Sequence, residues 1–256
     1  MIAQIFAAGL IAGILGAIMG LGGGIFLVPL LSLYFHLPIH IAVGTSLMAV
    51  IATSAGVAAF APPGHGADVG LALRLEMFTA AGAILGGWSA GFFSGKTLSL
   101  FFSVVVFLTA GYMVFKRAAD RLGAVKEALF ASSYMPVNWK WGFAGSGMAG
   151  MISGMLGIGG GFIKVPIMYA VMNVPLGVAT ATSNFMVGIT AAASVFVYYG
   201  RGDIYPMLVI PTALGVFAGA MFGAFVLARL RINWLRDALI LLLVIMGLQM
   251  LMKGLE

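Results

Sequence analysis

The chain has 256 residues, of which 62% are hydrophobic and 8% are charged, with a formal net charge of +6. Soluble domains carry roughly a quarter charged residues, and apolar runs of about twenty residues recur here, so the composition indicates a membrane protein that crosses the bilayer several times. The basic residues lie in short loops between apolar segments, where they set membrane orientation, and no nucleic-acid partner is expected. Cysteine is absent, which excludes disulfides.

The first predicted elements are two apolar segments separated by a run of glycines. Residues 20–30 read GLGGGIFLVPL. Such a run interrupts a helix, because glycine is conformationally free and proline lacks the backbone N–H. The broken pair and the three longer apolar segments after it span residues 4–20, 22–35, about 40–60, about 70–93 and about 97–115.

The second part of the chain has the same order of elements, and residues 154–167 read GMLGIGGGFIKVPI. The second broken pair and the segments after it span residues 141–157, 160–173, about 176–199, about 204–228 and about 236–252. The sequence therefore predicts an all-α polytopic membrane protein. Each half has a glycine-broken helical pair plus three membrane helices, in a first repeat at 1–115, a cytoplasmic linker at 116–140 and a second repeat at 141–256.

The two halves are copies of one unit. Residues 9–60 align without a gap with 146–197, at a constant offset of 137 (146 − 9). The register is marked by identical glycine, proline and hydroxyl residues, among them Gly22/Gly159, Pro29/Pro166, Thr45/Thr182, Ser46/Ser183 and Thr53/Thr190. Beyond a short insertion the alignment predicts three further pairs, Asp68/Asp203, Gly82/Gly215 and Gly86/Gly219.

Basic residues predict how the halves are oriented, because they favour the cytoplasmic side. The linker is basic from Lys116 to Lys140, and the loop with Arg229, Arg231 and Arg236 is basic too. If both are cytoplasmic, each half has an odd number of crossings and the second half is inverted, with the N-terminus outside. A parallel repeat ranks second, because it places the three arginines outside. The sequence leaves open whether the glycine-broken pairs cross fully or re-enter.

The glycine runs are candidate substrate-binding backbone. Unpaired backbone groups cost several kcal/mol each in hydrocarbon, so breaks persist where protein or a water-lined cavity satisfies them. Paired breaks in repeated halves point to a transporter's substrate site, and helix N-termini at such breaks favour anions. The candidate residues are Gly22, Gly23, Gly24, Gly159, Gly160 and Gly161. For two other glycine pairs we expect close helix packing instead: Gly9 with Gly13, and Gly82 with Gly86.

Lys164 lies three residues beyond the second glycine run, and its counterpart in the first half is Leu27. An ionisable residue near a mid-membrane break is a candidate functional group, and an ammonium could neutralise an anion. The alternative is a lysine whose stem lies along apolar surface and whose charge reaches the membrane interface.

Hydroxyl and amide side chains repeat after each break and could donate hydrogen bonds to an anion. They are Thr45, Ser46, Thr182, Ser183 and Asn184. Neutral donors replace water around an anion without holding it too tightly for release. The alternative is that the hydroxyls bond to the backbone of their own helix, which is common in membrane helices.

The remaining polar residues carry weaker signals. Glu76 and Asp203 are candidates for proton coupling, although most charges near the junction of the third and fourth segments are expected to pair locally. His36 and His40 flank Pro38 with no nearby carboxylate, so no metal site is expected. No cofactor and no enzymatic activity are expected.

The doubled G-x-GGG-x-x-x-VP signature, with a later proline and Thr-Ser in each half, resembles the TauE/SafE sulfite exporter family over nearly the whole chain. The resemblance implies a transporter of small sulfur oxyanions or sulfonates such as sulfite, and export is implied only by it. The paired breaks predict a secondary transporter in the inner membrane, which binds one small anion between the two breaks and exposes that site alternately to the two sides. A channel-like anion pore, and a transporter of another small anion or sulfur compound working as an importer, remain alternatives. A homodimer is left open.

Overall fold

The computed structural model describes residues 2–19, 22–60, 67–130, 134–227 and 233–255. Every regular element within those ranges is helical, so the predicted all-α class is confirmed. Five of the described helices are long and apolar enough to cross a membrane. The first half contains α1 (Ile2–Met19), α2 (Gly24–Pro29), the π-helical segment η1 (Leu30–Tyr34), α3 (Ile39–Phe60), α4 (Val69–Ala90) and α5 (Gly95–Phe130).

The second half repeats this order. Its elements are α6 (Trp139–Leu156), α7 (Gly161–Pro166), the π-helical segment η2 (Ile167–Val171), α8 (Leu176–Gly200), α9 (Pro206–Leu227) and α10 (Asn233–Leu255). One predicted boundary differs, because α5 continues to Phe130 and so runs through the first part of the predicted linker. Arg229 and Arg231 lie outside the described residues.

A proline in each half changes a short α-helix into a wider π-helical turn. Pro29 ends α2 and Pro166 ends α7, and η1 and η2 follow directly. A proline removes one helical N–H donor and crowds the preceding turn, which the wider π turn relieves. Two residues beyond the end of each π segment lies a residue with positive φ, His36 at 52° and Asn173 at 56°. The equivalent turns confirm that the repeat extends to backbone conformation.

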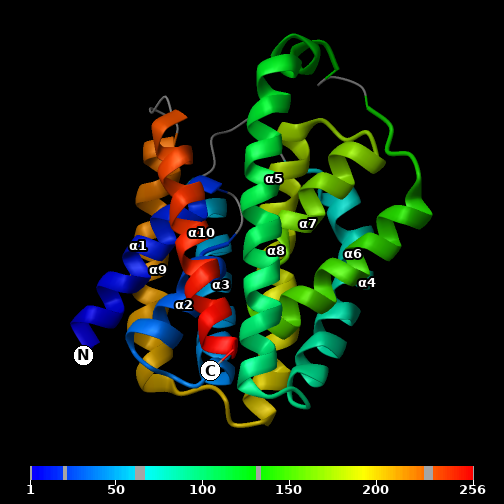
Figure 1. Ribbon diagram of the computed structural model, residues 1–256. Coiled ribbons are helices and arrows are strands. Elements are labelled where there is room, and N and C mark those ends of the chain that lie inside the picture. The colour runs from blue at the N-terminus through cyan, green and yellow to red at the C-terminus, as the bar shows by residue number, and fades with distance from the viewer. Residues whose placement is uncertain (1, 20–21, 61–66, 131–133, 228–232, 256) are drawn as a thin grey trace.

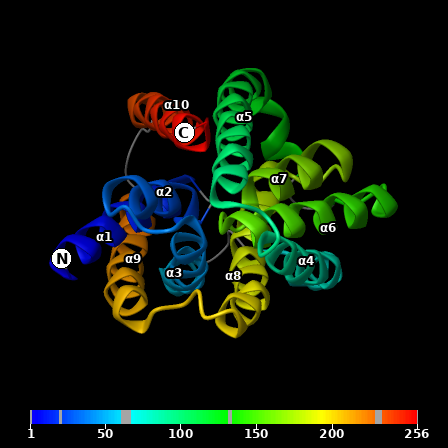
Figure 2. The same ribbon diagram turned by 60° about the horizontal axis from the view of Figure 1, so that its bottom comes forward.

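Six helices pack in one row, in the order α1, α9, α3, α8, α4 and α6 (Figures 1 and 2). The two halves are therefore interlocked, because α9 of the second half lies between α1 and α3 of the first, and α4 lies between α8 and α6. The contact between α3 and α8 is the centre of the row. Beside the row, α5 packs on α10, and the two run in opposite directions in Figure 1.

Glycines allow the outer helix pairs to approach closely. A Cβ on Gly82 or Gly86 of α4 would overlap a carbonyl oxygen of α6, from Gly147 and Met151 respectively. A Cβ on Gly13 of α1 would overlap the carbonyl oxygen of Val216 in α9. The expected packing role of Gly9, Gly13, Gly82 and Gly86 is confirmed.

The same contacts correct the predicted register of the fourth helices. Gly82 meets the carbonyl oxygen of Gly147, and Gly219, not Gly215, meets that of Leu10. Leu10 and Gly147 are counterparts at the offset of 137 (147 − 10), so Gly82 corresponds to Gly219 (219 − 82 = 137). The offset of 137 therefore continues into α4 and α9 without the predicted insertion.

The packing role of the glycines gives a stability prediction. Gly86→Ala should destabilise the protein by about 1–3 kcal/mol, because the added methyl overlaps the backbone of Met151. Gly111→Ala in α5 is the matched control, since a Cβ there meets nothing within 4 Å. The midpoint of thermal unfolding in detergent should fall for Gly86→Ala and stay level for Gly111→Ala. Equal midpoints for both variants would contradict the packing assignment.

Candidate functional site

Both predicted helix breaks are present. The first lies between Met19 and Gly24, and the second between Leu156 and Gly161. The second is built on left-handed backbone, with φ of 72° at Gly157, 91° at Gly159 and 77° at Gly160, a conformation that favours glycine. All six candidate glycines are buried, and Gly22 also has positive φ.

The two breaks meet at the centre of the molecule. A Cβ on Gly24 would overlap the carbonyl oxygen of Gly157 and lie 2.8 Å from the Ser46 hydroxyl oxygen. Ser46 itself donates a hydrogen bond of 2.8 Å to that same carbonyl. A glycine break of the first half, a helix end of the second and a hydroxyl of α3 therefore share one point of contact.

The other predicted hydroxyls of α3 and α8 differ in their partners. Thr182 Oγ1 accepts a hydrogen bond from the Asp68 backbone N–H at 3.0 Å. Its counterpart Thr45 and the Ser183 hydroxyl are buried and have no hydrogen-bond partner among the described residues. Asn184 is half-buried, and its backbone carbonyl accepts a bond from Ser54 Oγ at 2.8 Å. In each of the repeated pairs, Thr45/Thr182 and Ser46/Ser183, one hydroxyl is paired and the other remains available.

Lys164 lies inside the protein and contacts two polar side chains. Its side chain is 1% exposed, and its Nζ lies 3.5 Å from Glu76 Oε2. The ammonium also donates to Thr190 Oγ1 at 2.5 Å, and Thr190 in turn donates to Glu76 Oε1 at 2.6 Å or to the Met186 carbonyl at 2.9 Å. We call Lys164, Glu76 and Thr190 the polar cluster. The Lys164 ammonium does not reach the protein surface in this structure.

The polar cluster connects three helices, two of which, α8 and α4, are neighbours in the row. Lys164 lies on α7, Thr190 on α8 and Glu76 on α4. The Lys164 backbone N–H bonds to the Gly160 carbonyl, which ties the lysine to the glycine break. The sequence marks Glu76 only as a candidate for proton coupling, and it marks Thr190 only as a residue identical to Thr53 in the aligned repeat. Their contact with Lys164 spans 88 and 26 residues, which local sequence pattern does not reveal.

The charged residues of the polar cluster have no charged equivalent in the mirrored position. At the offset of 137, Lys164 corresponds to Leu27, Thr190 to Thr53 and Glu76 to Ala213. Leu27 is fully buried, and Thr53 bonds to the Ala49 carbonyl of its own helix at 3.0 Å. The duplicated scaffold therefore packs with an apolar residue where Lys164 stands.

Of the other charged residues, Arg201 and Asp203 pair locally, as the sequence predicts, whereas Arg74 and Asp68 contact residues from distant parts of the sequence. Arg201 Nε donates to Asp203 at 2.8 Å, and Arg74 lies over the Trp139 ring at 5.4 Å. Asp68 caps the N-terminus of α4 and accepts a hydrogen bond from the Tyr134 hydroxyl. Burial alone would raise the pKa of Asp68, but the bonds from Tyr134 and from the Leu71 backbone N–H outweigh burial and hold this pKa below its ordinary value.

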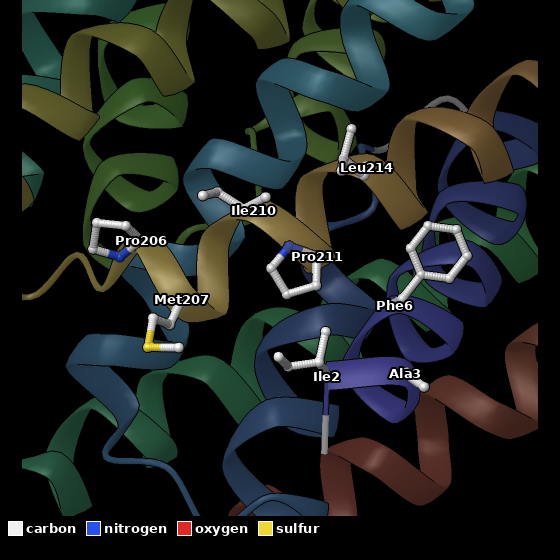
Figure 3. Close-up of a pocket in the computed structure, with 8 residues that line it drawn as sticks. All are labelled: Ile2, Ala3, Phe6, Pro206, Met207, Ile210, Pro211 and Leu214. Carbon is white, nitrogen blue, oxygen red and sulfur yellow. The ribbon is translucent and has the colours of Figure 1, made fainter.

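A groove of about 640 Å³ lies away from the breaks, between α1 and α9 (Figure 3). Its lining is apolar and includes Ile2, Phe6, Ile210 and Leu214. An anion needs hydrogen-bond donors, which this lining lacks, so the groove is not the candidate site.

Comparison with known proteins gives matches across both repeats. A family model described as "Sulfite exporter TauE/SafE" matches residues 5–250. The "Probable membrane transporter protein YunE" of Bacillus subtilis is 24% identical over 261 residues, which cover 96% of each chain. The "Probable membrane transporter protein YdhB" of the same organism is 30% identical over 226 residues, which cover 86% of each chain. A probable membrane transporter protein of Haemophilus influenzae is 28% identical over 96% of each chain. No solved structure gives a significant match.

Proposed function

Because this chain belongs to the sulfite exporter TauE/SafE family and is a multi-pass membrane transporter, we propose that it exports small sulfur oxyanions or sulfonates, such as sulfite, across the inner membrane. The observation that carries the anion assignment is the ammonium of Lys164, buried next to the second glycine break. A buried positive charge inside a transporter is a typical feature of an anion pathway.

The proposed site lies between the two breaks. The glycine backbone of residues 22–24 and 159–161 lets an anion approach main-chain N–H groups. Thr45 and Ser183 add buried hydroxyls that have no partner among the described residues. Ser46, Thr182 and Asn184 hold α3, α6, α8 and the start of α4 together through their own bonds, and so position the site.

Alternating access is the proposed mechanism, with the row of helices dividing at its centre between α3 and α8. One unit then contains α1, α9 and α3, and the other contains α8, α4 and α6. The opposite directions of α5 and α10 in Figure 1 support an inverted repeat, and the basic residues support a cytoplasmic linker.

A thermal-shift screen of purified protein tests this proposal. Sulfite, sulfate, thiosulfate, taurine and sulfoacetate are added in turn, with chloride as the control anion. A ligand at about 100 times its Kd stabilises the folded state by about 2.7 kcal/mol, so at least one sulfur anion should raise the midpoint of thermal unfolding. The Lys164→Met variant should lose that increase, because it lacks the ammonium.

Two results would contradict the proposal. One is that none of the five compounds raises the midpoint of the wild-type protein. The other is that Lys164→Met responds to the same anion as strongly as the wild type does, which would place the anion away from Lys164.

A further inference from the structure

We propose that Glu76 couples anion binding to proton binding. In the structure described above, the Glu76 carboxylate pairs with the ammonium of Lys164. When Glu76 takes up a proton it loses its negative charge, and the ammonium can then pair with a singly charged oxyanion instead. This inference rests on the proposed function, since it concerns the same site. It specifies that the transported form is a monoanion, which moves together with one proton.

The first support is that Glu76 competes directly for the group that would hold the anion. Lys164 has Glu76 Oε2 at 3.5 Å and Thr190 Oγ1 at 2.5 Å as its polar partners. Thr190 also donates to Glu76 Oε1 at 2.6 Å, so both carboxylate oxygens face the same ammonium region. An anion bound to the Lys164 ammonium would therefore lie beside the negative charge of Glu76.

The second support is that the polar cluster is isolated from other charges. Helix α4 packs on α6 and α8, and the short α7 supplies Lys164. On α6 the charged residue is Lys140, in the first turn, and on α8 the nearest titratable group along the helix is Tyr198, whose hydroxyl bonds to the Met155 carbonyl. Among the described residues, Lys164 is thus the charged group that faces Glu76.

The third support is charge balance in a medium of low dielectric constant. The Lys164–Glu76 pair has a net charge of zero, and adding a monoanion alone would leave one buried negative charge. Burying an uncompensated charge is unfavourable by several kcal/mol per ion. Adding one proton and one monoanion keeps the sum at zero: the proton goes to a Glu76 oxygen, and the anion pairs with the ammonium.

The fourth support is the internal comparison between the two halves. A buried ion pair rarely stabilises a fold more than apolar residues of similar size do. The mirrored position has Leu27 and Ala213 in place of Lys164 and Glu76, and Leu27 is fully buried. Because the duplicated scaffold packs without charges at this point, a purely structural role does not account for the pair.

The experiment measures sulfite affinity of purified wild type and Glu76→Gln by thermal shift or calorimetry from about pH 6 to about pH 9. Sulfite titrates in this range, but its own protonation affects both proteins equally. The wild-type affinity should fall more steeply with rising pH than that of Glu76→Gln. The ratio of the two affinities should change by about tenfold per pH unit, which corresponds to one linked proton.

Asp203→Asn is the matched control, since Asp203 is the other carboxylate that the sequence marks for proton coupling and pairs with Arg201 instead. Its pH dependence should follow that of the wild type. Equal slopes for wild type and Glu76→Gln would overturn the inference. If neither protein binds sulfite at any pH, the proposed substrate fails rather than the coupling, because the loss is then independent of Glu76.

A measurement on the wild type alone covers the case in which Glu76→Gln does not fold. Sulfite contains no carbonyl group, so the infrared difference spectrum on adding sulfite reports protein carboxyl groups directly. We expect a new C=O stretching band of a protonated carboxylic acid. A spectrum in which sulfite binds, as the thermal shift confirms, and no such band appears would overturn the inference.

Discussion

Gly24→Ala is expected to destabilise the protein strongly, because it adds a methyl group at the contact between the two breaks. The added Cβ would overlap the Gly157 carbonyl oxygen, and it would lie 2.8 Å from Ser46 Oγ and 3.0 Å from Val50 Cγ2. The carbonyl cannot retreat without breaking its bond from Ser46. Overpacking typically destabilises by about 1–3 kcal/mol, so the midpoint of thermal unfolding should fall by about 2–12 °C.

Gly177→Ala is the matched control, because Gly177 is also in the first turn of a helix and a Cβ there meets nothing within 4 Å. Its midpoint should stay within about 1 °C of the wild type, since substitutions away from packed features change stability by less than about 0.5 kcal/mol. If Gly24→Ala unfolds at the wild-type temperature, the contact between the two breaks is not close-packed, and the central site described above is wrong.

The second large effect is expected from separating Lys164 from Glu76. Glu76→Leu alone leaves a buried ammonium without its counter-charge, and breaking a buried pair in this way typically destabilises by about 3–5 kcal/mol. Lys164→Met alone should be milder at acidic pH, because a carboxyl group left without its partner becomes neutral by binding a proton. The double variant, Glu76→Leu with Lys164→Met, should recover most of the lost stability, because the mirrored position packs with apolar residues in place of the two charges.

Thermal unfolding of all four proteins at neutral pH forms a double-mutant cycle that isolates the interaction. Thr53→Val, in the mirrored half, controls for changes in packing at an equivalent site without charge. Additive losses, with the double variant as unstable as the sum of the single variants, would show that the two side chains do not interact.

Local sequence predicted the breaks because their signal is chemical and short. A run of glycines disfavours continuous helix, and α1, α2, α6 and α7 begin or end within a few residues of the expected positions. The π-helical segments after Pro29 and Pro166 were not predicted, since the sequence shows where a proline interrupts hydrogen bonding but not how the next turn adjusts.

Two predictions from the sequence were wrong, the register of α9 and the end of α5, and one contact, that of Lys164 with Glu76, was missed. The glycines of α9 recur every four residues, at Gly215, Gly219 and Gly223, so an alignment by sequence fits one turn too early as well as it fits the true register. Apolar composition also did not show that α5 continues past 115, because a helix that leaves the membrane loses its hydrophobic signal but keeps its backbone bonds. The partner of Lys164 lies 88 residues away, which only the fold brings into contact.

The interlocked order of the row has a consequence for biosynthesis. When the ribosome has completed α5, the glycine faces of α1 and α4 have been inserted, but their partners α9 and α6 have not yet been translated. Those faces must remain lipid-covered until later helices enter between them. The first half alone therefore lacks the helices that its glycine faces contact in the folded protein, and it cannot reach this packing before α6 and α9 have been made.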